Sequence, residues 1–262
     1  MQKPVLVLAI AAALCAAMPA FPQARAASTP PTATAQHKDF PAPSTQQPSA
    51  KAAQLDQLYT DFWEATLKLN PVQATFVGDS RYNDQLPNFL SEDYRAQNHA
   101  FNTEWLAKAK AIGPDGLGGQ ALLSYDIFVK SLQDDLDGER FRDDLQPIDQ
   151  FNNIAMLVVQ FGSGTGAQPF KTVKDYDNWL ARASKVPTIL DQAIVNMREG
   201  VKVGIVQPKV LMVKVLPQLD AIMKDKPEDT AFWGPIAKLP KDFSAADRKR
   251  LTTAYQQLIT NS

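Results

Sequence analysis

The chain has 262 residues, of which 45% are hydrophobic and 21% are charged, a composition typical of a soluble globular protein. Such a composition excludes the disordered, collagen-like and multi-span membrane classes. The 27 Lys and Arg residues nearly balance the 28 Asp and Glu residues, which leaves a formal net charge of −1. A nucleic-acid-binding domain would need a concentrated basic surface, so we expect no nucleic-acid partner.

The first 26 residues have the parts of a secretory signal peptide. Lys3 supplies the positive charge, an apolar run extends from Val5 to Met18, and Ala24-Arg25-Ala26 has the small-x-small pattern of a cleavage site. The run is shorter than the roughly 20 residues that a permanent membrane-spanning helix needs. We therefore expect an exported protein, periplasmic or extracellular, with no permanent membrane span.

Cys15, the single cysteine, lies in the apolar run directly after Leu14. A lipoprotein signal would place a small residue before the cysteine, so we expect release and not lipid anchoring. Cleavage after Ala26 would leave a chain that can form no disulfide and offers no thiolate nucleophile.

Residues 27–51 are rich in Ser, Thr, Pro, Ala and Gln, and Phe40 is their one large apolar residue. Such a segment buries too little apolar surface to offset the entropy lost on ordering. We predict a disordered linker here, followed by one helical domain over residues 52–262.

From residue 52 onward, apolar residues recur with the spacing of amphipathic helices. The first stripe consists of Leu55, Leu58, Tyr59, Phe62 and Trp63. Asn70 and Pro71 should end this helix and begin the next, because Asn accepts hydrogen bonds from a first turn and proline suits the first helical position. Gly78 is the residue predicted to follow that short helix.

Further helices are predicted from start and stop signals along the chain. The predicted starts are Ser91, Thr172 with Asp175, Pro187, Pro208, and Ser244 with Asp247. Another helix should run from Leu122 to Leu136. Gly200 is expected to close the helix that Pro187 opens, and Pro217 should kink or end the one that follows.

The apolar run from Ile154 to Phe161 fits either a buried helix or a strand, because periodicity does not distinguish the two over so few residues. No alternation of strands and helices occurs along the chain. We therefore predict an all-α fold, an irregular multi-helix bundle.

A catalytic zinc site needs three protein ligands and an open position, typically two His and a carboxylate. The chain has two histidines, and His37 lies in the predicted linker. His99 is expected at the surface or boundary of its helix, since no good zinc ligand lies three or four residues away. The sequence therefore provides no catalytic, cofactor-binding or metal-binding residue, and we expect no cofactor in this chain.

The run Gly162-Ser163-Gly164-Thr165-Gly166-Ala167 matches a dinucleotide-binding turn in its glycine spacing. Residues 168–170 do not open a helix and no parallel strands follow, so we interpret the run as a flexible loop. It also lacks the patterns of a P-loop and of a nucleophile elbow.

Acidic residues cluster twice, and paired carboxylates can serve as general acid and base in a glycosidase. The two clusters are Asp134, Asp135 and Asp137, and Asp143 and Asp144. Arg140 and Arg142 lie nearby, so solvated acids paired with these arginines are the favoured interpretation.

The four tryptophans can stack on sugars, but three of them lie on apolar stripes, which favours core packing. They are Trp63, Trp105, Trp179 and Trp233.

Two groups of motifs resemble the bacterial domain-of-unknown-function 885 (DUF885) family. The first comprises Leu58-Tyr59-x-x-Phe62-Trp63-Glu64 and Asn70-Pro71-x-x-Ala74-Thr75-x-x-Gly78-Asp79-x-Arg81-Tyr82-x-Asp84-x-Leu86-Pro87. The second comprises Asp175-Tyr176-x-x-Trp179-Leu180-x-Arg182, Pro187 to Gln192, Met197-Arg198-Glu199-Gly200, Gly204-Ile205-Val206-Gln207-Pro208 and Val210 to Leu219. The resemblance covers nearly all of residues 52–260.

The resemblance implies an exported helical protein, usually about twice this length, related to zinc metallopeptidases of the H-E-x-x-H type. The zinc motifs lie in the second half of such proteins, so no family catalytic residue transfers to this sequence. Zinc and a peptide substrate are expected only for a full-length member. The turn Gly204–Pro208 would then lie on one wall of a substrate cleft, although a plain helix connection is the simpler interpretation.

Two hypotheses follow. In the first, the chain is the N-terminal, truncated portion of a zinc metallopeptidase-like protein and is inactive alone. In the alternative, it is a non-catalytic periplasmic binding or interaction protein. The sequence specifies neither a substrate nor an oligomeric state.

Overall fold

The computed structural model describes residues 49–261, which form helices and connecting loops with no strand. This confirms the all-α prediction. The elements in chain order are α1 (Ala50–Leu69), α2 (Pro71–Phe76), η2 (Ser80–Tyr82), α3 (Glu92–Ile112), α4 (Gly119–Gly138), η3 (Asp143–Leu145), α5 (Ile154–Gly162), α6 (Val173–Ala183), α7 (Val186–Val203), α8 (Lys209–Ile222), η4 (Pro227–Asp229), η5 (Ala231–Trp233), α9 (Gly234–Ala237) and α10 (Ala245–Asn261).

The predicted signal peptide, and the predicted linker up to residue 48, lie outside the described residues. The side chain of Ser49 caps α1 by accepting from the backbone N–H of Ala52, so the first helix begins two residues before the predicted domain boundary. Among residues 49–261, no helix combines the length and the apolar composition needed to cross a bilayer.

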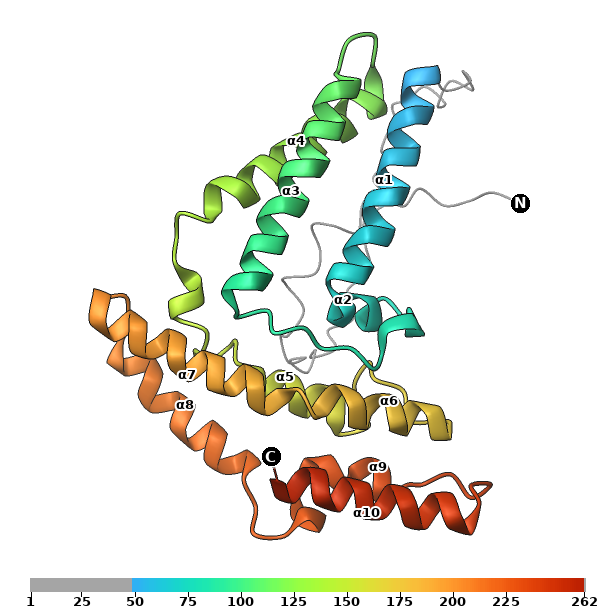
Figure 1. Ribbon diagram of the computed structural model, residues 1–262, viewed down its shortest axis with the longest axis vertical. Helices are drawn as coiled ribbons and strands as arrows, with labels where there is room; N and C mark the ends of the chain where they lie inside the picture. Colours follow the sequence, from blue (N-terminus) through green and yellow to red (C-terminus); the bar gives the residue numbers. More distant parts are fainter. Residues whose placement is uncertain (1–48, 262) are drawn as a thin grey trace, which may run out of the picture.

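Helices α1, α3 and α4 form a bundle with its own hydrophobic core (Figure 1). Its buried residues are Leu55, Leu58, Trp105, Leu106, Ala109, Tyr125, Phe128 and Leu132. The ring of Phe62 packs edge-on against Trp105 and Phe128, with centroid distances of 5.5 and 4.9 Å. Leu55, Leu58, Tyr59 and Phe62 of the first predicted apolar stripe belong to this core, whereas half-buried Trp63, the fifth residue of the stripe, does not.

The rest of the chain forms a second helical unit around another core (Figure 1). Helices α5, α6 and α7 lie below the bundle, and α9 and α10 lie below α6. The buried residues of this core are Phe161, Tyr176, Trp179, Ala183, Ile236, Leu251 and Tyr255. The run from Ile154 to Phe161, which the sequence left open, is helical because Asn153 caps it and Phe161 is buried against α6.

A single buried arginine on α6, Arg182, connects the two units. Its side chain is 2% exposed and donates hydrogen bonds to three backbone carbonyls of the α2–η2 region and to Gln168 Oε1. The carbonyls are those of Tyr82 at 2.7 Å, Gln85 at 3.0 Å and Pro71 at 3.4 Å. This region connects α1 to α3, which are both helices of the bundle. Arg182 therefore attaches α6 to the segment that joins these two helices.

The guanidinium of Arg182 has no carboxylate partner among the described residues. Burial lowers its pKa to about 10, with Asp84 acting in the opposite direction. The group therefore stays charged at neutral pH, and the carbonyl dipoles around it replace water. A part-buried hydrogen bond joins neighbouring segments, in which Asn196 of α7 donates to the carbonyl of Leu90, just before α3, at 2.9 Å.

The predicted caps are present, because each depends on residues within three positions of one another. Asn70 caps α2, Ser91 caps α3, and Thr172 with Asp175 forms a capping box on α6. Ser244 accepts from the backbone N–H of Asp247 at the start of α10.

One predicted helix end is wrong. Helix α7 continues through Gly200 to Val203 and is capped by Gly204, whose φ is 77°. Gly200 serves packing, since a Cβ there would lie 2.5 Å from the carbonyl oxygen of Ile205 and 2.9 Å from that of Leu145. Of the two alternatives predicted at Pro217, a kink or a helix end, the end is excluded, because α8 runs on to Ile222.

We expect Arg182→Met to lower the free energy of unfolding by about 3 kcal/mol or more, since each buried carbonyl left without its donor costs about 1–3 kcal/mol. Urea denaturation followed by circular dichroism measures the change. Arg250→Gln is the matched control, because that half-exposed arginine pairs with Asp177 at the surface and its loss should cost about 1 kcal/mol or less. Equal effects of the two changes would contradict the role given to Arg182.

Candidate functional site

A cleft of about 940 Å³ lies between the bundle and the second helical unit. Its walls come from the C-terminal half of α1, the start of α2, the first half of α3, the end of α4, η3 and α5. Arg182 does not line the cleft, but its hydrogen bonds join α6 to the segment between α1 and α3, whose residues Pro87 and Phe89 are part of the lining. Residues far apart in the sequence therefore line one cavity.

Aromatic side chains form much of the cleft lining, and they are Phe62, Phe89, Tyr94, Phe101 and Phe141. Phe62 and Phe101 contact each other with a centroid distance of 5.4 Å. Phe141 is 60% exposed, so its ring is available to a ligand. These rings provide a surface for apolar groups.

Two groups of ion-paired side chains line the cleft beside the aromatic residues. His99 Nδ1 lies 2.7 Å from Glu139 Oε2. Arg95 Nη1 lies 3.0 Å from Asp144 Oδ2, and the same carboxylate accepts from Arg142 Nε at 2.8 Å. The hydrogen bonds from Arg142, reinforced by the charge of Arg95, hold the pKa of Asp144 below its usual value.

Asp135 is the carboxyl of the cleft whose charged form is disfavoured. Burial, together with the negative charges of Asp134 and Glu139, raises its pKa above the usual value. A carboxyl with a raised pKa in a cleft is a candidate proton donor or acceptor. Within residues 49–261, Asp135 belongs to no group of three or more His, Cys, Asp or Glu side chains that could hold a metal ion.

His99 is 60% exposed, which confirms the prediction of a surface position. Its partner Glu139 lies 40 residues away, and sequence spacing gave no signal for this contact. Of the predicted acid–arginine pairs, Arg142 with Asp144 is present, whereas Arg140 lies over the ring of Phe141, 4.8 Å from its centroid. Asp134 pairs instead with Lys130.

The residues that the structure describes do not fit a zinc site. His99 faces one carboxylate, and no group of three or more His, Cys, Asp or Glu side chains within residues 49–261 is arranged to hold a metal ion. Zinc requires three protein ligands at a catalytic site. This cleft therefore does not supply them.

The glycine-rich run after α5 is a loop, as predicted, and the next helix begins only at Val173. Its glycines allow close packing: a Cβ at Gly162 would lie 2.4 Å from the Trp179 ring, and one at Gly166 would lie 1.9 Å from the Gln160 carbonyl oxygen. Trp105 and Trp179 are buried in the two cores, which agrees with the packing interpretation.

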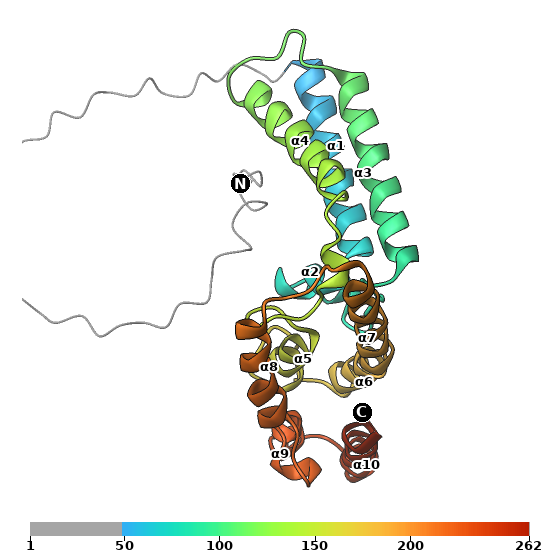
Figure 2. The ribbon, with the colours of Figure 1, turned by 90° about the vertical axis from the view of Figure 1, so that its left-hand side faces the viewer.

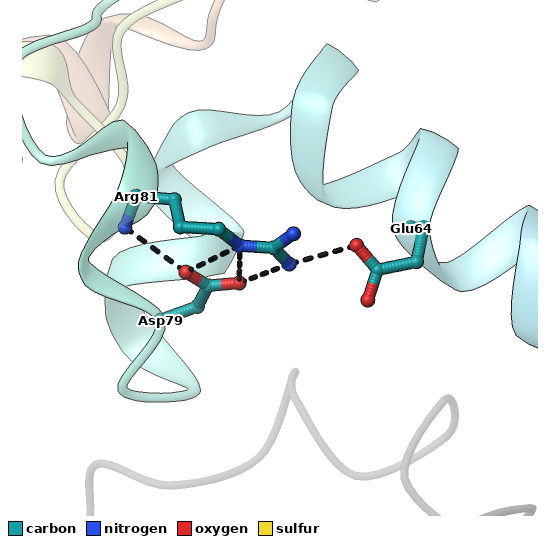
Figure 3. A network of polar contacts seen from close by, with 3 residues as sticks. All are labelled: Glu64, Asp79 and Arg81. Carbon is teal, nitrogen blue, oxygen red and sulfur yellow. Dashed lines mark hydrogen bonds and ion pairs between the residues drawn. The ribbon is translucent and has the colours of Figure 1, made fainter.

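The Asp79–Arg81 motif forms a surface network outside the cleft lining (Figure 3). Arg81 Nε lies 2.9 Å from Asp79 Oδ2, and Arg81 Nη2 lies 2.8 Å from Glu64 Oε2 on α1. The hydrogen bonds from Arg81 lower the pKa of Asp79. The network fastens the α2–η2 turn to α1, so we assign it a structural role.

The sequence also matches a model of a protein family. The family model described as "Bacterial protein of unknown function (DUF885)" matches residues 71–262. The match includes α2 and every element after it, and therefore Arg182 and most of the cleft. A comparison with curated proteins finds no match.

Asp144→Asn should lower the free energy of unfolding by about 1 kcal/mol at pH 7, because it removes the charge that Arg142 and Arg95 share. The folded-state pKa of Asp144 is lowered, so its contribution is present above the unfolded pKa and is lost as the pH falls through the folded value. The difference in the free energy of unfolding between Asp144→Asn and the wild type should therefore shrink below about pH 4. Urea denaturation at several pH values tests this, with the exposed Asp134→Asn as control.

Gly200→Ala should lower the free energy of unfolding by about 1–3 kcal/mol, because the added methyl collides with two backbone carbonyls. Gly138→Ala is the matched control, since its Cβ would meet nothing within 4 Å and alanine favours a helix by up to about 1 kcal/mol. Thermal denaturation compares the two. An unchanged stability of Gly200→Ala would refute the close contact between α7 and η3.

Proposed function

The chain belongs to the DUF885 family, and from this premise we propose that it provides a helical, non-catalytic wall of the substrate cleft in an exported zinc metallopeptidase-like protein. The cleft between α1, α3, α4 and α5 is the observation that carries the proposal. In this proposal the cleft binds a peptide segment, and the chain alone does not hydrolyse it.

The size and lining of the cleft support a peptide ligand. Its volume of about 940 Å³ lies at the upper end of the roughly 300–1,000 Å³ of small-molecule sites, which leaves room for several residues. The aromatic rings suit apolar side chains. The carboxylates and Arg95 can hydrogen-bond to backbone N–H and carbonyl groups respectively.

Zinc chemistry, which the family resemblance implies, would come from residues outside 49–261. Metal-bound water attacking a carbonyl needs a complete ligand set and a base. Since the cleft residues do not form such a set, we assign them binding and orientation only. The proposed role is therefore substrate positioning.

The alternative is a non-catalytic binding or interaction protein. One observation favours it, namely that the described residues form the cleft by themselves. Under this alternative, the bound molecule is released unchanged and no zinc-bearing partner is needed.

Binding of fluorescein-labelled hexapeptides, each with one aromatic residue, tests the proposal through fluorescence anisotropy. Phe141→Ser should weaken binding at least about fivefold, because it removes an exposed ring from the cleft. Phe151→Ser is the matched control: Phe151 is 80% exposed and is not among the cleft residues, so its loss should leave binding unchanged.

Three results would contradict the proposal. The first is the absence of peptide binding, and the second is an equal effect of the two phenylalanine changes. The third is tight one-to-one zinc on the purified chain, measured by mass spectrometry of the metal. Hydrolysis of peptides by the chain together with a zinc-bearing partner, but not without it, would favour the peptidase wall over the binding protein.

A further inference from the structure

The end of α7 and the beginning of α8 form a corner with an unusual surface. Six large aliphatic side chains of this corner are between 51% and 70% exposed, and they are Val201, Val203, Val206, Val210, Val213 and Leu216. In Figure 1, α7 and α8 meet at the left and then diverge, and Figure 2 looks onto this side, with their connecting loop above both helices. We call these six residues the aliphatic corner.

Helix α8 is apolar on both of its faces. Val215 is 1% exposed and packs inward, whereas Val210 and Val213 project from the opposite side of the helix. Exposed aliphatic side chains that gather on one part of a protein surface mark a contact with protein or with lipid. The outward face of α8 is uncovered in residues 49–261, so a further contact is needed to explain it.

The charge of the corner differs from that of the chain. Residues 198–217 contain four basic residues and one acidic residue, although the whole chain has a net charge of −1. The acidic residue, Glu199, pairs with Lys202 at 3.0 Å. Lys209 and Lys214 form no ion pair with any described residue and border the outward face of α8. The partner should therefore be negatively charged as well as apolar.

We propose that the aliphatic corner binds the surface of an anionic lipid bilayer, with its aliphatic side chains in the headgroup–acyl boundary and Lys209 and Lys214 at the phosphates. Lysines beside exposed aliphatic side chains can bind an anionic bilayer surface, because apolar burial at the headgroup boundary and attraction to the phosphates add together. Each lysine near an anionic surface adds attraction. The association is peripheral, since no described helix can cross the membrane.

A protein partner fits these observations less well. Lysine is depleted in protein–protein interfaces, and charged residues are depleted most at their centres, whereas here lysines alternate with the exposed valines. The corner also lies at an outer edge of the molecule, at the left in Figure 1, where a flat bilayer can reach it.

Vesicle flotation tests the proposal with two lipid compositions, phosphatidylglycerol mixed with phosphatidylethanolamine, and phosphatidylcholine alone. Both the full chain and the form beginning at Ala27 are used, because the apolar run from Val5 to Met18 can bind lipid by itself. The Ala27 form should bind the anionic vesicles at least about tenfold more tightly than the neutral ones. Salt at 0.5 M should reduce this preference.

Two double variants separate the contributions of charge and of apolar contact. Lys209→Glu with Lys214→Glu should lower the partition coefficient for anionic vesicles by about tenfold or more. Val210→Ser with Val213→Ser should lower it for both lipid compositions. Leu123→Ser with Ile127→Ser is the matched control on α4, where the two side chains are 52% and 53% exposed. Circular dichroism checks that each variant is folded.

The proposal is overturned if the Ala27 form binds no vesicle, if it shows no preference for anionic lipid, or if the α8 variants bind as the wild type does. Light scattering adds one more decisive result. A dimer that dissociates when Val210 and Val213 are replaced would assign the aliphatic corner to a protein interface instead.

Discussion

The charged guanidinium of Arg182, buried against backbone carbonyls, is the interaction on which the arrangement of this molecule depends. It joins α6 to Tyr82 and Gln85, which belong to the segment between α1 and α3. Without a carboxylate partner, the group is stable only where several carbonyl dipoles converge. This need for several carbonyls around the guanidinium constrains the path of the α2–η2 segment. The segment lies between two units that have separate hydrophobic cores.

The cleft shares the segment between α1 and α3 with that junction. Helices α1 and α3 of the bundle supply Phe62, Tyr94, Phe101 and Arg95, and the segment after α4 supplies Glu139, Phe141 and, in η3, Asp144. Glu139 and Asp144 are paired within the wall, and Asp135 is the cleft carboxyl whose pKa is raised. A surface that combines ion pairs with the exposed ring of Phe141 is suited to holding a chain of mixed polarity, and no group of three or more His, Cys, Asp or Glu side chains within residues 49–261 could hold a metal ion.

Much of the helical order follows from the sequence, because caps and apolar stripes depend on residues a few positions apart. Asn70 and Thr172 were predicted as caps for this reason, and both are caps. Contacts across the chain had no such signal: Glu139 lies 40 residues from His99, and Tyr82 lies 100 from Arg182. Gly200 was misinterpreted as a helix end because a glycine that stops a helix and one that permits a close contact look alike in sequence.

Hydrogen–deuterium exchange of the wild type and of Arg182→Met tests the central claim most directly. If Arg182 holds the junction, the variant should exchange faster in residues 71–90 and along the cleft side of α3, while the core of the α1–α3–α4 bundle keeps its protection. Unchanged exchange in residues 71–90, or a uniform increase over the whole chain, would contradict the account.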